Sequence, residues 1–491
     1  MAAVTDARAG GRAVRAGNAA DTSMKRDEPF DPATVRSFRF AGYELGCAGS
    51  GAPSLELRYA FDLDGSTNDG ERIEFTEQVV FEGGRHPEDE AGRAALERAA
   101  WLVHLIAGIS YYKAAVPAEI LVDTGPVPAE VAAFLERLYL FGLGEFAYRN
   151  QIDLRERIRF PSSDVSPQPL AAPVLPRRTA VPVGGGKDSI VTIEALRRAG
   201  EPMVLFSVGD PEPIREVARV AGMDRIVVTR RISPALLDLN RRGALNGHVP
   251  ISAILASIMA ASSVVYGFDA AALSNERSAD EGNLVWNELE INHQYSKTSA
   301  FERDFGAIVE RQAVPGFTYF SFLRPFSELA ISALFSTEDV AYLDVFRSCN
   351  AAFRIDETRR ARRWCGDCPK CRFVFLALAP FMARDRLLTV FGKDLLDDES
   401  QASGYAEMLG LEAHKPFECV GEVGECVAAL AWCASSPEWR DDALVRRFAA
   451  RLPALEETRR LLDEALRPGS AVSLPQRYRA MLPSVPVARD A

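Results

Sequence analysis

The amino-acid sequence predicts an α/β protein with a doubly wound parallel sheet, an N-terminal α+β domain and a helical C-terminal part that carries a cysteine knuckle. Two observations predict the sheet. From residue 178 onward, short apolar runs alternate with helix-compatible patterns, as in parallel sheets covered by helices. A glycine-rich turn, Gly184 to Gly186, follows the first of these runs. Because doubly wound sheets bind ligands at the carboxyl ends of their strands, this turn lies where a ligand is expected.

The chain of 491 residues is long enough for several domains. A segment rich in proline and serine, residues 161–177, predicts a linker. The expected parts are a disordered tail at 1–34, the N-terminal α+β domain at 35–160, the linker at 161–177, the parallel-sheet domain at 178–345, the cysteine knuckle at 346–380 and a helical region at 381–491.

The N-terminal domain shows strand patterns followed by helix patterns. Apolar periodicity predicts two strands and then two helices: Leu55 to Leu63, Ile73 to Phe81, Ala95 to Tyr112 and Pro128 to Phe141. His104 lies inside the first of these helices. A histidine hydrogen-bonded in the core is favoured there over a metal ligand.

The parallel-sheet domain shows the alternation expected of βα units. The predicted strands are Ala180 to Val183, Met203 to Val208, Arg225 to Thr229 and Ala270 to Leu273. The predicted helices are the one that follows the glycine turn and stops at Gly200, Glu212 to Ala221, and Ile251 to Tyr266. Pro182 fits only near the end of its strand, because proline cannot donate to a sheet ladder.

The glycine turn and the residues after it have the composition of a phosphate site. Glycines let backbone N–H groups approach phosphate oxygens, and the N-terminus of the following helix carries positive partial charge. Asp188 could hold Mg²⁺, and Ser189 could donate to a phosphate. The spaced G-x-x-x-x-G-K-[ST] pattern of a Walker loop is missing. An ordinary glycine-rich turn between a strand and a helix is the alternative.

Composition and charge argue against several classes of protein. Apolar residues make up 47% and charged residues 25%, as in globular proteins. No apolar run is long enough to span a membrane, and the first 30 residues lack the apolar core of a signal peptide, so we expect a cytoplasmic protein. The net charge of −11 argues against a large nucleic-acid surface. Arginine clusters at 230–231, 241–242 and 359–363 could still bind a small polyanion.

Four of the eight cysteines have the spacing of a metal knuckle. Cys365, Cys368 and Cys371 form C-x-x-C-x-x-C, and Cys349 lies sixteen residues before them. Four thiolates satisfy tetrahedral Zn²⁺ without an open position, which predicts a structural zinc site. An iron–sulfur cluster held by three cysteines and a set of free thiols are the alternatives. Three further cysteines recur every seven residues and are interpreted as one packed face of a helix: Cys419, Cys426 and Cys433.

Two polar loops between the glycine turn and the knuckle are expected to contact a substrate. The first, residues 274–278 (S-N-E-R-S), follows the strand that ends at Leu273, and the second covers residues 290–297. Only seven of the 57 basic residues are lysines, so Lys187, which follows the glycine turn, and Lys297, in the second loop, stand out. Solvated loops without a function are the alternative. His248 precedes a predicted helix and is expected to cap it or to contact a phosphate.

The six residues from Gly184 to Ser189 resemble the SGGxDS loop of the ATP pyrophosphatase (PP-loop) superfamily, whose members cleave ATP to AMP and pyrophosphate. Gly184 stands where those enzymes usually have serine. The lone cysteine followed by C-x-x-C-x-x-C is similar to the arrangement in 7-cyano-7-deazaguanine synthase, another member. The resemblance implies a PP-loop sheet with ATP and Mg²⁺ as cofactors. The glycine loop would then surround the pyrophosphate, and Asp188 would bind the metal.

The order of the motifs along the chain resembles one family in particular. The motifs are G-G-G-K-D-S, N-G-H-V-P-I-S, S-N-E-R-S, N-H-Q-Y-S-K, the cysteine knuckle and H-K-P-F-E-C. From about residue 35 to 470 the chain is similar to the UDP-N-acetylmuramoyl-L-alanyl-L-glutamate epimerases of certain bacteria. The resemblance implies conversion of the terminal L-Glu of UDP-MurNAc-L-Ala-L-Glu to D-Glu in peptidoglycan biosynthesis, with ATP consumed to AMP and pyrophosphate.

Adenylation makes such an epimerisation chemically reasonable. A proton next to a carboxylate is hard to remove, whereas the carbonyl of an acyl-adenylate can accept the developing charge. The residues expected to take part in catalysis are Lys187, Asp188, Glu276, His293 and Lys297. Of these, Glu276, His293 and Lys297 are the acid/base candidates. The residues expected to bind substrate are Asn275, Arg277 and His248.

Two other classes of function stay open at this point. An ATP-dependent nitrile, amide or thiolation enzyme of the same superfamily would carry the same loop. A non-catalytic nucleotide-binding or scaffold protein would explain the missing serine at Gly184, but the retained Lys187, Asp188 and Ser189 argue against it. The sequence indicates neither nucleic acid nor a membrane as a partner, and carries no signal for an oligomeric state.

Overall fold

The computed structural model describes residues 28–64, 71–164, 168–353, 360–361, 363–412, 414–452 and 454–489. Within these residues, nine strands form one mixed sheet, and two further strands form a separate hairpin. The sheet order is β11-β8-β5-β6-β7-β3-β2-β1-β4. Residues 1–27 of the predicted tail (1–34) lie outside the described residues. Phe30, which also belongs to the predicted tail, is buried and stacks on Phe61.

One half of the sheet is parallel, as the alternating sequence pattern predicts. Its strands are β5 (Thr179–Pro182), β6 (Met203–Val208), β7 (Arg225–Arg231), β8 (Ala270–Leu273) and β11 (Thr318–Ser321). All neighbouring pairs in the order β11-β8-β5-β6-β7 run parallel. Pro182 is the last residue of β5, so its missing N–H interrupts no ladder. The α/β fold class with a largely parallel sheet is therefore confirmed.

The other half of the sheet comes from the N-terminal region. Its strands are β1 (Val35–Cys47), β2 (Pro53–Leu63), β3 (Arg72–Phe81) and β4 (Glu119–Val122). β1, β2 and β3 pair antiparallel, and β4 runs parallel to β1. β3 also pairs antiparallel with β7, which joins the two halves into one continuous sheet. The division of the chain into separate domains stays a prediction.

A buried ion pair lies at the seam between the two halves. Arg230 of β7 binds Glu77 of β3, with Nε 2.7 Å from Oε1, and the side chain of Glu77 is fully buried. Tyr111 donates its hydroxyl to the other oxygen of Glu77 at 2.8 Å. The expectation that Arg230 binds a polyanion is therefore wrong, because its charge is paired with that of Glu77 inside the sheet.

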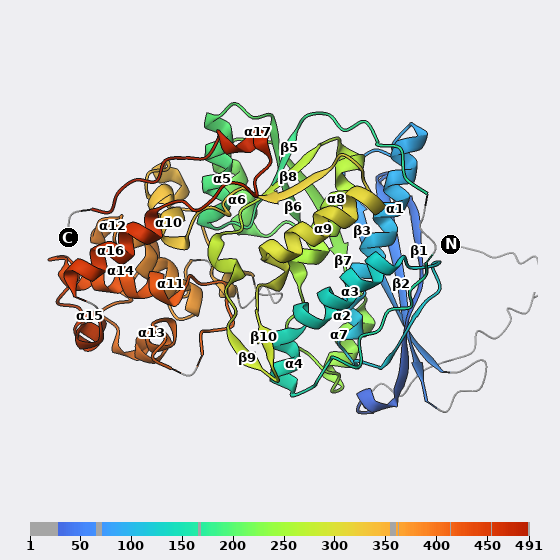
Figure 1. Cartoon of the computed structure of the whole chain (residues 1–491), viewed down its shortest axis with the longest axis horizontal. Helices are drawn as coiled ribbons and strands as arrows, with labels where there is room; N and C mark the ends of the chain where they lie inside the picture. Colours follow the sequence, from blue (N-terminus) through green and yellow to red (C-terminus); the bar gives the residue numbers. More distant parts are fainter. Residues whose placement is uncertain are drawn as a thin grey trace, which may run out of the picture.

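Helices cover both faces of the sheet (Figure 1). Successive strand residues face opposite sides: in β6, Val204 and Phe206 pack into one core and Leu205 into the other. The first core includes α1 (Glu90–Ala107), α2 (Ile109–Tyr112), α3 (Ala129–Gly142), α4 (Gly144–Asn150), α7 (Pro234–Arg241), α8 (Ile251–Tyr266) and α9 (Ser299–Gln312). The second includes α5 (Lys187–Arg198), α6 (Glu212–Ala221), α10 (Glu328–Ser336) and α11 (Pro369–Leu378).

Most C-terminal helices extend the second core toward the end of the molecule opposite β1 to β3 (Figure 1). They are α12 (Arg384–Phe391), α13 (Ala402–Met408), α14 (Val423–Ser435), α15 (Ala443–Phe448) and α16 (Leu455–Leu466). The last helix, α17 (Gln476–Arg479), returns to lie beside β5. The separate hairpin consists of β9 (Leu284–Trp286) and β10 (Leu289–Ile291). Among the helices that the structure describes, none combines the length and the apolar character that crossing a membrane requires.

His104 is a core residue, as the sequence predicts. Its side chain is fully buried in α1, and Nε2 lies 3.1 Å from the carbonyl oxygen of Arg58. Burial lowers the pKa of the imidazole to about 4, so the ring is neutral at pH 7. It packs against the rings of Phe40 and Tyr59.

Candidate active site

A cavity of about 260 Å³ lies at the carboxyl ends of β5 and β8. These strands are neighbours, and the strand order reverses between them, since β6 and β7 lie on one side and β11 on the other. Such a reversal opens a crevice at the end of the sheet, which is the usual ligand site of doubly wound folds. Lining residues that bear on function include Gly184, Asp188, Asn275, Glu276, Lys297 and Lys370.

The glycine loop connects β5 to α5 at the edge of this cavity. Gly185 has φ of +80°, and a Cβ added to it would lie 3.0 Å from Cβ of Pro213 and 3.3 Å from the carbonyl oxygen of Arg347. Glycine is required there for both reasons. A Cβ added to Gly184 would meet no atom within 4 Å, so the serine usual in PP-loop enzymes would fit at this position.

Lys187 lies beneath the loop and is not among the residues that line the cavity. Its buried Nζ donates to Oδ1 of Asp188 at 2.5 Å and forms an ion pair with Glu328 of α10. Burial alone would lower the pKa of Lys187, but the two carboxylates outweigh burial and raise it above its ordinary value. The lysine is therefore a fixed cation that holds Asp188 at the cavity wall.

The polar loop after β8 brings two predicted residues to the cavity and leaves one outside. Asn275 and Glu276 line the cavity, and Nδ2 of Asn275 donates to Oγ of Ser321 at 3.0 Å. Arg277 is not a lining residue; it begins the 3-10 helix η2 (Arg277–Asp280) and lies near Gly469.

Glu276 is buried, which sets the protonation of its carboxyl group. Burial raises the pKa of Glu276 above its ordinary value; the charge of Lys297 opposes this rise, and that of Asp188 adds to it. A carboxyl group with a raised pKa holds its proton more tightly, and its carboxylate is a stronger base than an exposed one. Glu276 is therefore suited to general acid or base catalysis.

Lys297 ends the 3-10 helix η3 (Tyr295–Lys297) and also lines the cavity. Its Nζ donates to Sγ of Cys419 at 3.0 Å and to Oε1 of Gln294 at 3.3 Å. Burial alone would lower the pKa of Lys297, but Cys419 and Glu276 outweigh it and raise the pKa. The ammonium therefore lies between two acidic groups at the cavity wall.

The placement of Cys419 corrects the sequence interpretation. α14 begins at Val423, so Cys419 lies in the loop before this helix and not on its packed face. Burial would raise the pKa of Cys419, but the positive charges of Lys297, Lys370 and His293 outweigh burial and hold it well below its ordinary value. Cys426 and Cys433 are fully buried in α14, as predicted.

His293 forms a cluster with Glu145 and His248. Nδ1 of His293 is 2.5 Å from Oε2 of Glu145 in α4, and the two imidazole rings are 4.3 Å apart. Burial alone would lower the pKa of His293, but Cys419 and Glu145 raise it to about 9. Burial and the charge of His293 lower the pKa of His248 to about 4, so only His293 is charged at pH 7.

Neither histidine lines the cavity. His248 lies three residues before α8, whose N-cap is Pro250 and whose first turn receives no side-chain cap. The expectation that His248 caps this helix is therefore wrong.

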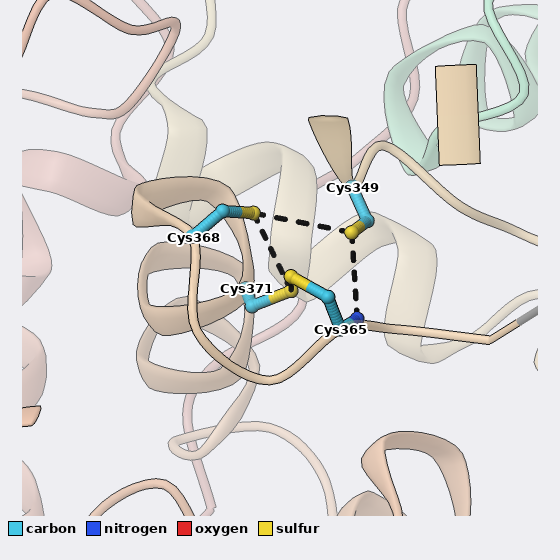
Figure 2. Close-up of side chains that lie close together, drawn as sticks. All are labelled: Cys349, Cys365, Cys368 and Cys371. Carbon is cyan, nitrogen blue, oxygen red and sulfur yellow. Dashed lines mark hydrogen bonds between the residues drawn. The ribbon is translucent and has the colours of Figure 1, made fainter. Parts of the chain in front are cut away.

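Four cysteine sulfurs converge where the sequence predicts a metal knuckle (Figure 2). Their Sγ atoms all lie within 4.8 Å of one another; Cys368 is 3.5 Å from Cys371 and 3.9 Å from Cys349, and Cys365 is 3.6 Å from Cys371. Tetrahedral zinc with bonds of about 2.3 Å places its sulfurs about 3.8 Å apart, so the spacing fits. Backbone N–H groups of Cys365 and Gly366 donate to two of the sulfurs at 3.4 and 3.3 Å.

The knuckle also supplies side chains to the cavity. Ser348 precedes Cys349, Lys370 lies between Cys368 and Cys371, and both line the cavity. A Cβ added to Gly186 would lie 3.2 Å from Cβ of Ser348, so the knuckle packs directly on the glycine loop. The scarcity of lysine, which singles out Lys187 and Lys297, could also have identified Lys370.

Other residues near the site carry no signal in the sequence. Glu145 and Glu328 lie far from the loops in sequence, in α4 and α10, and no local motif marks them. In the second arginine cluster, Arg241 is exposed and pairs with Asp238 at 2.9 Å, and Nε of Arg242 donates to the carbonyl oxygen of Glu28 at 2.8 Å. In the third cluster, Arg359 and Arg362 lie outside the described residues.

The chain matches two family models, the MurL N-terminal domain over residues 29–322 and the MurL C-terminal domain over residues 345–462. The cavity takes Asp188, Glu276 and Lys297 from the first of these regions and Lys370 from the second. The active-site candidate is thus assembled from both matched parts of the chain.

Three relatives share the name UDP-N-acetyl-alpha-D-muramoyl-L-alanyl-L-glutamate epimerase. The relative from Xanthomonas oryzae pv. oryzae is 44% identical over 85% of this chain and 90% of its own length. Those from Micromonospora sp. and Salinispora tropica are 42% and 43% identical, covering 90% and 87% of this chain and 96% and 92% of their own lengths. At this identity and coverage, the chain belongs to the MurL family of UDP-N-acetyl-alpha-D-muramoyl-L-alanyl-L-glutamate epimerases.

Proposed function

We propose that the protein converts the terminal L-Glu of UDP-MurNAc-L-Ala-L-Glu to D-Glu, with ATP consumed to AMP and pyrophosphate, in cytoplasmic peptidoglycan precursor synthesis. One observation carries the proposal: a single cavity joins the glycine loop and Asp188 to the acid/base groups Glu276 and Lys297. The name that the three relatives share supports the choice of substrate.

Adenylation of the terminal carboxylate is the first chemical step. A carboxylate oxygen of the substrate attacks the α-phosphorus of ATP, and pyrophosphate leaves with the electron pair of the broken P–O bond. The open backbone at Gly184 and the N-terminus of α5 can receive phosphate oxygens. Asp188 would hold Mg²⁺, which neutralises phosphate charge. Ser189 lies in the same turn and lines the cavity.

Proton transfer at Cα is the second step. We assign it to Glu276 and Lys297, because both line the cavity, whereas His293 does not. One group takes the Cα proton, the C–H electron pair moves into the activated carbonyl, and the other group returns a proton to the opposite face. Hydrolysis of the acyl-adenylate then releases AMP and the D-Glu product.

The cysteine knuckle has a structural role in this proposal. Zn²⁺ held by Cys349, Cys365, Cys368 and Cys371 would fix the backbone of both chain segments that supply Ser348 and Lys370 to the cavity. Lys370 adds a positive charge beside the glycine loop, where a nucleotide would place its phosphates.

A PP-loop amide, nitrile or thiolation enzyme is the second candidate, because the knuckle is similar to that of 7-cyano-7-deazaguanine synthase. Protein incubated with ATP, Mg²⁺ and UDP-MurNAc-L-Ala-L-Glu, without an ammonia or sulfur donor, distinguishes the two. We expect AMP, pyrophosphate and D-Glu in a product of unchanged mass. Formation of ADP, or a requirement for a nitrogen or sulfur donor, would rule out the epimerase.

Variants of two aspartates add a matched comparison to this experiment. Asp188→Asn should abolish AMP formation because it weakens the Mg²⁺ site. Asp238→Asn, in helix α7, removes one partly exposed carboxylate that does not line the cavity and should leave the rate unchanged.

A further inference from the structure

Two of the five histidines of the chain meet in a cluster with Glu145, outside the cavity. The rings of His248 and His293 are 4.3 Å apart, and Nδ1 of each faces Oε2 of Glu145, at 3.7 and 2.5 Å. None of these three residues lines the cavity. Two imidazoles around one carboxylate oxygen, in a chain so poor in histidine, point to a chemical use for the cluster.

Three separate segments of the chain bring the donor atoms together. Glu145 belongs to α4, His248 to the loop before α8, and His293 to the loop between β10 and η3. Their side chains are only 8%, 21% and 16% exposed. A Cβ added to Gly247 would lie 3.2 Å from Cδ2 of Phe146, so the segment of His248 packs directly on α4. The fold therefore shelters the three donors from water and holds them at fixed positions.

Neighbouring groups orient two of the three donors. Oε1 of Glu145 accepts from Nε of Arg149 at 2.6 Å, which leaves Oε2 directed toward the histidines. The backbone N–H of His293 donates to Oδ1 of Asn283 at 2.8 Å, which fixes the chain where this histidine begins. Groups that hold the donor residues from outside the ligand set are typical of metal sites.

We propose that Glu145, His248 and His293 bind a divalent transition-metal ion of the zinc class, at a site separate from the cysteine knuckle. Two imidazole nitrogens and one carboxylate oxygen suit such ions, whereas Mg²⁺ prefers oxygen ligands. Ligand atoms on one zinc ion, with bonds of about 2.0–2.1 Å, lie about 3.0–3.4 Å apart. The distances from the two Nδ1 atoms to Oε2 lie on either side of this range. The ion takes the place of the proton between His293 and Glu145, and this proton passes to solvent.

The metal site is linked to the active site through His293. A hydrogen bond joins His293 to Cys419, whose Sγ accepts from Nζ of Lys297 at 3.0 Å. His293 also lies four residues before Lys297 in the same polar loop. A bound ion therefore fixes the backbone that places Lys297 at the cavity wall. This consequence for catalysis rests on the proposed function, whereas the binding of the metal does not.

The test is a titration of the full-length purified protein with Co²⁺ in the presence of excess Mg²⁺. Three nitrogen and oxygen donors hold zinc less tightly than four thiolates, so we expect purification to leave only the knuckle ion in place. Each chain should then take up one Co²⁺, with the visible absorption of cobalt on nitrogen and oxygen ligands. A thiolate-to-cobalt charge-transfer band should not appear.

Variants of the histidines identify the ligands. His248→Asn and His293→Asn should each weaken Co²⁺ binding by about a hundredfold or more, because each removes one ligand of the ion. His86→Asn, at an exposed histidine outside the cluster, is the matched control and should bind Co²⁺ like the wild type. Circular dichroism of each variant shows whether it has folded.

X-ray absorption at the cobalt edge determines the ligands in the wild-type protein, and so decides the question even if a variant does not fold. Two imidazoles among nitrogen and oxygen ligands would support the site. Sulfur ligands, no uptake of Co²⁺ by the wild type, or unchanged uptake in both folded histidine variants would overturn it. Failure to form AMP and D-Glu would overturn only the proposed function, because the titration requires neither ATP nor substrate.

Discussion

Nζ of Lys187 lies 2.5 Å from Oδ1 of Asp188, although the two residues are neighbours in the first turn of α5. The same Nζ pairs with Glu328 at the start of α10. The lysine thereby connects the glycine loop to the helix behind it and directs the carboxylate of Asp188 toward the cavity. A substitution of Lys187 should therefore affect the glycine loop, although Lys187 does not line the cavity.

Lys187→Met should lower the free energy of unfolding by about 3 kcal/mol, because it leaves the buried carboxylate of Glu328 without its cation. Lys187→Met combined with Glu328→Gln should regain much of this loss, since no unpaired charge is then buried. Urea unfolding of the wild type, both single variants and the double variant measures the coupling. If the losses of unfolding free energy in the two single variants simply add in the double variant, the pair has no energetic role.

The first two glycines of the loop should respond differently to substitution. Gly185→Ala should cost about 1–3 kcal/mol of stability, because alanine is strained at positive φ and its Cβ would press on Pro213. Gly184→Ser should leave stability unchanged, since the position is open. Thermal unfolding of both variants measures the difference. Equal unfolding temperatures for these two variants would contradict the loop conformation described here.

Purified protein should contain one zinc ion per chain, bound by the four cysteines of the knuckle. Cys365→Ser should lower the zinc content and the unfolding temperature, because metal binding is coupled to folding. Activity should fall as well, since the knuckle places Lys370 at the cavity. Elemental analysis that finds iron, or no metal, in folded and active protein would refute the zinc assignment.

Acid should destabilise the N-terminal half through His104. Its pKa is lowered to about 4 in the folded protein, whereas an unfolded chain has a histidine pKa of about 6.5. The unfolded state therefore binds more protons between these values, and stability falls as pH drops from 6.5 toward 4. His104→Gln should lack this part of the slope, worth at most about 3 kcal/mol. Identical pH dependence of unfolding in the wild type and the variant would contradict this role of His104.

Four of the five strands in the parallel half of the sheet were predictable, because local periodicity detects their short apolar runs; β11 (Thr318–Ser321) was not predicted. Met203–Val208 and Ala270–Leu273 are buried on both faces, and their observed ends equal the predicted ones. The pairing of β3 with β7 was not predictable, since an antiparallel contact between distant segments leaves no local pattern. The same applies to Glu328 and Glu145, which reach the site only through the packing of α10 and α4.

Cys419 shows how a regular spacing can mislead. Three cysteines at intervals of seven residues indicate one helix face, yet the helix begins only at Val423. In the structure, a capping box formed by Glu422 and Glu425 defines that start. Glutamate is not one of the usual N-cap residues, so the sequence does not show this start. Its role in the site depends on Lys297, a partner 122 residues away.

The proposed epimerisation requires an ATP-dependent proton exchange at Cα of the terminal glutamate. This exchange can be measured by incubating UDP-MurNAc-L-Ala-L-Glu with the protein and Mg²⁺ in D₂O, with and without ATP, followed by mass spectrometry and chiral analysis of the glutamate. We expect D-Glu with one deuterium at Cα, only when ATP is present. Glutamate that keeps its α-proton and its L configuration while ATP is consumed would contradict the epimerisation.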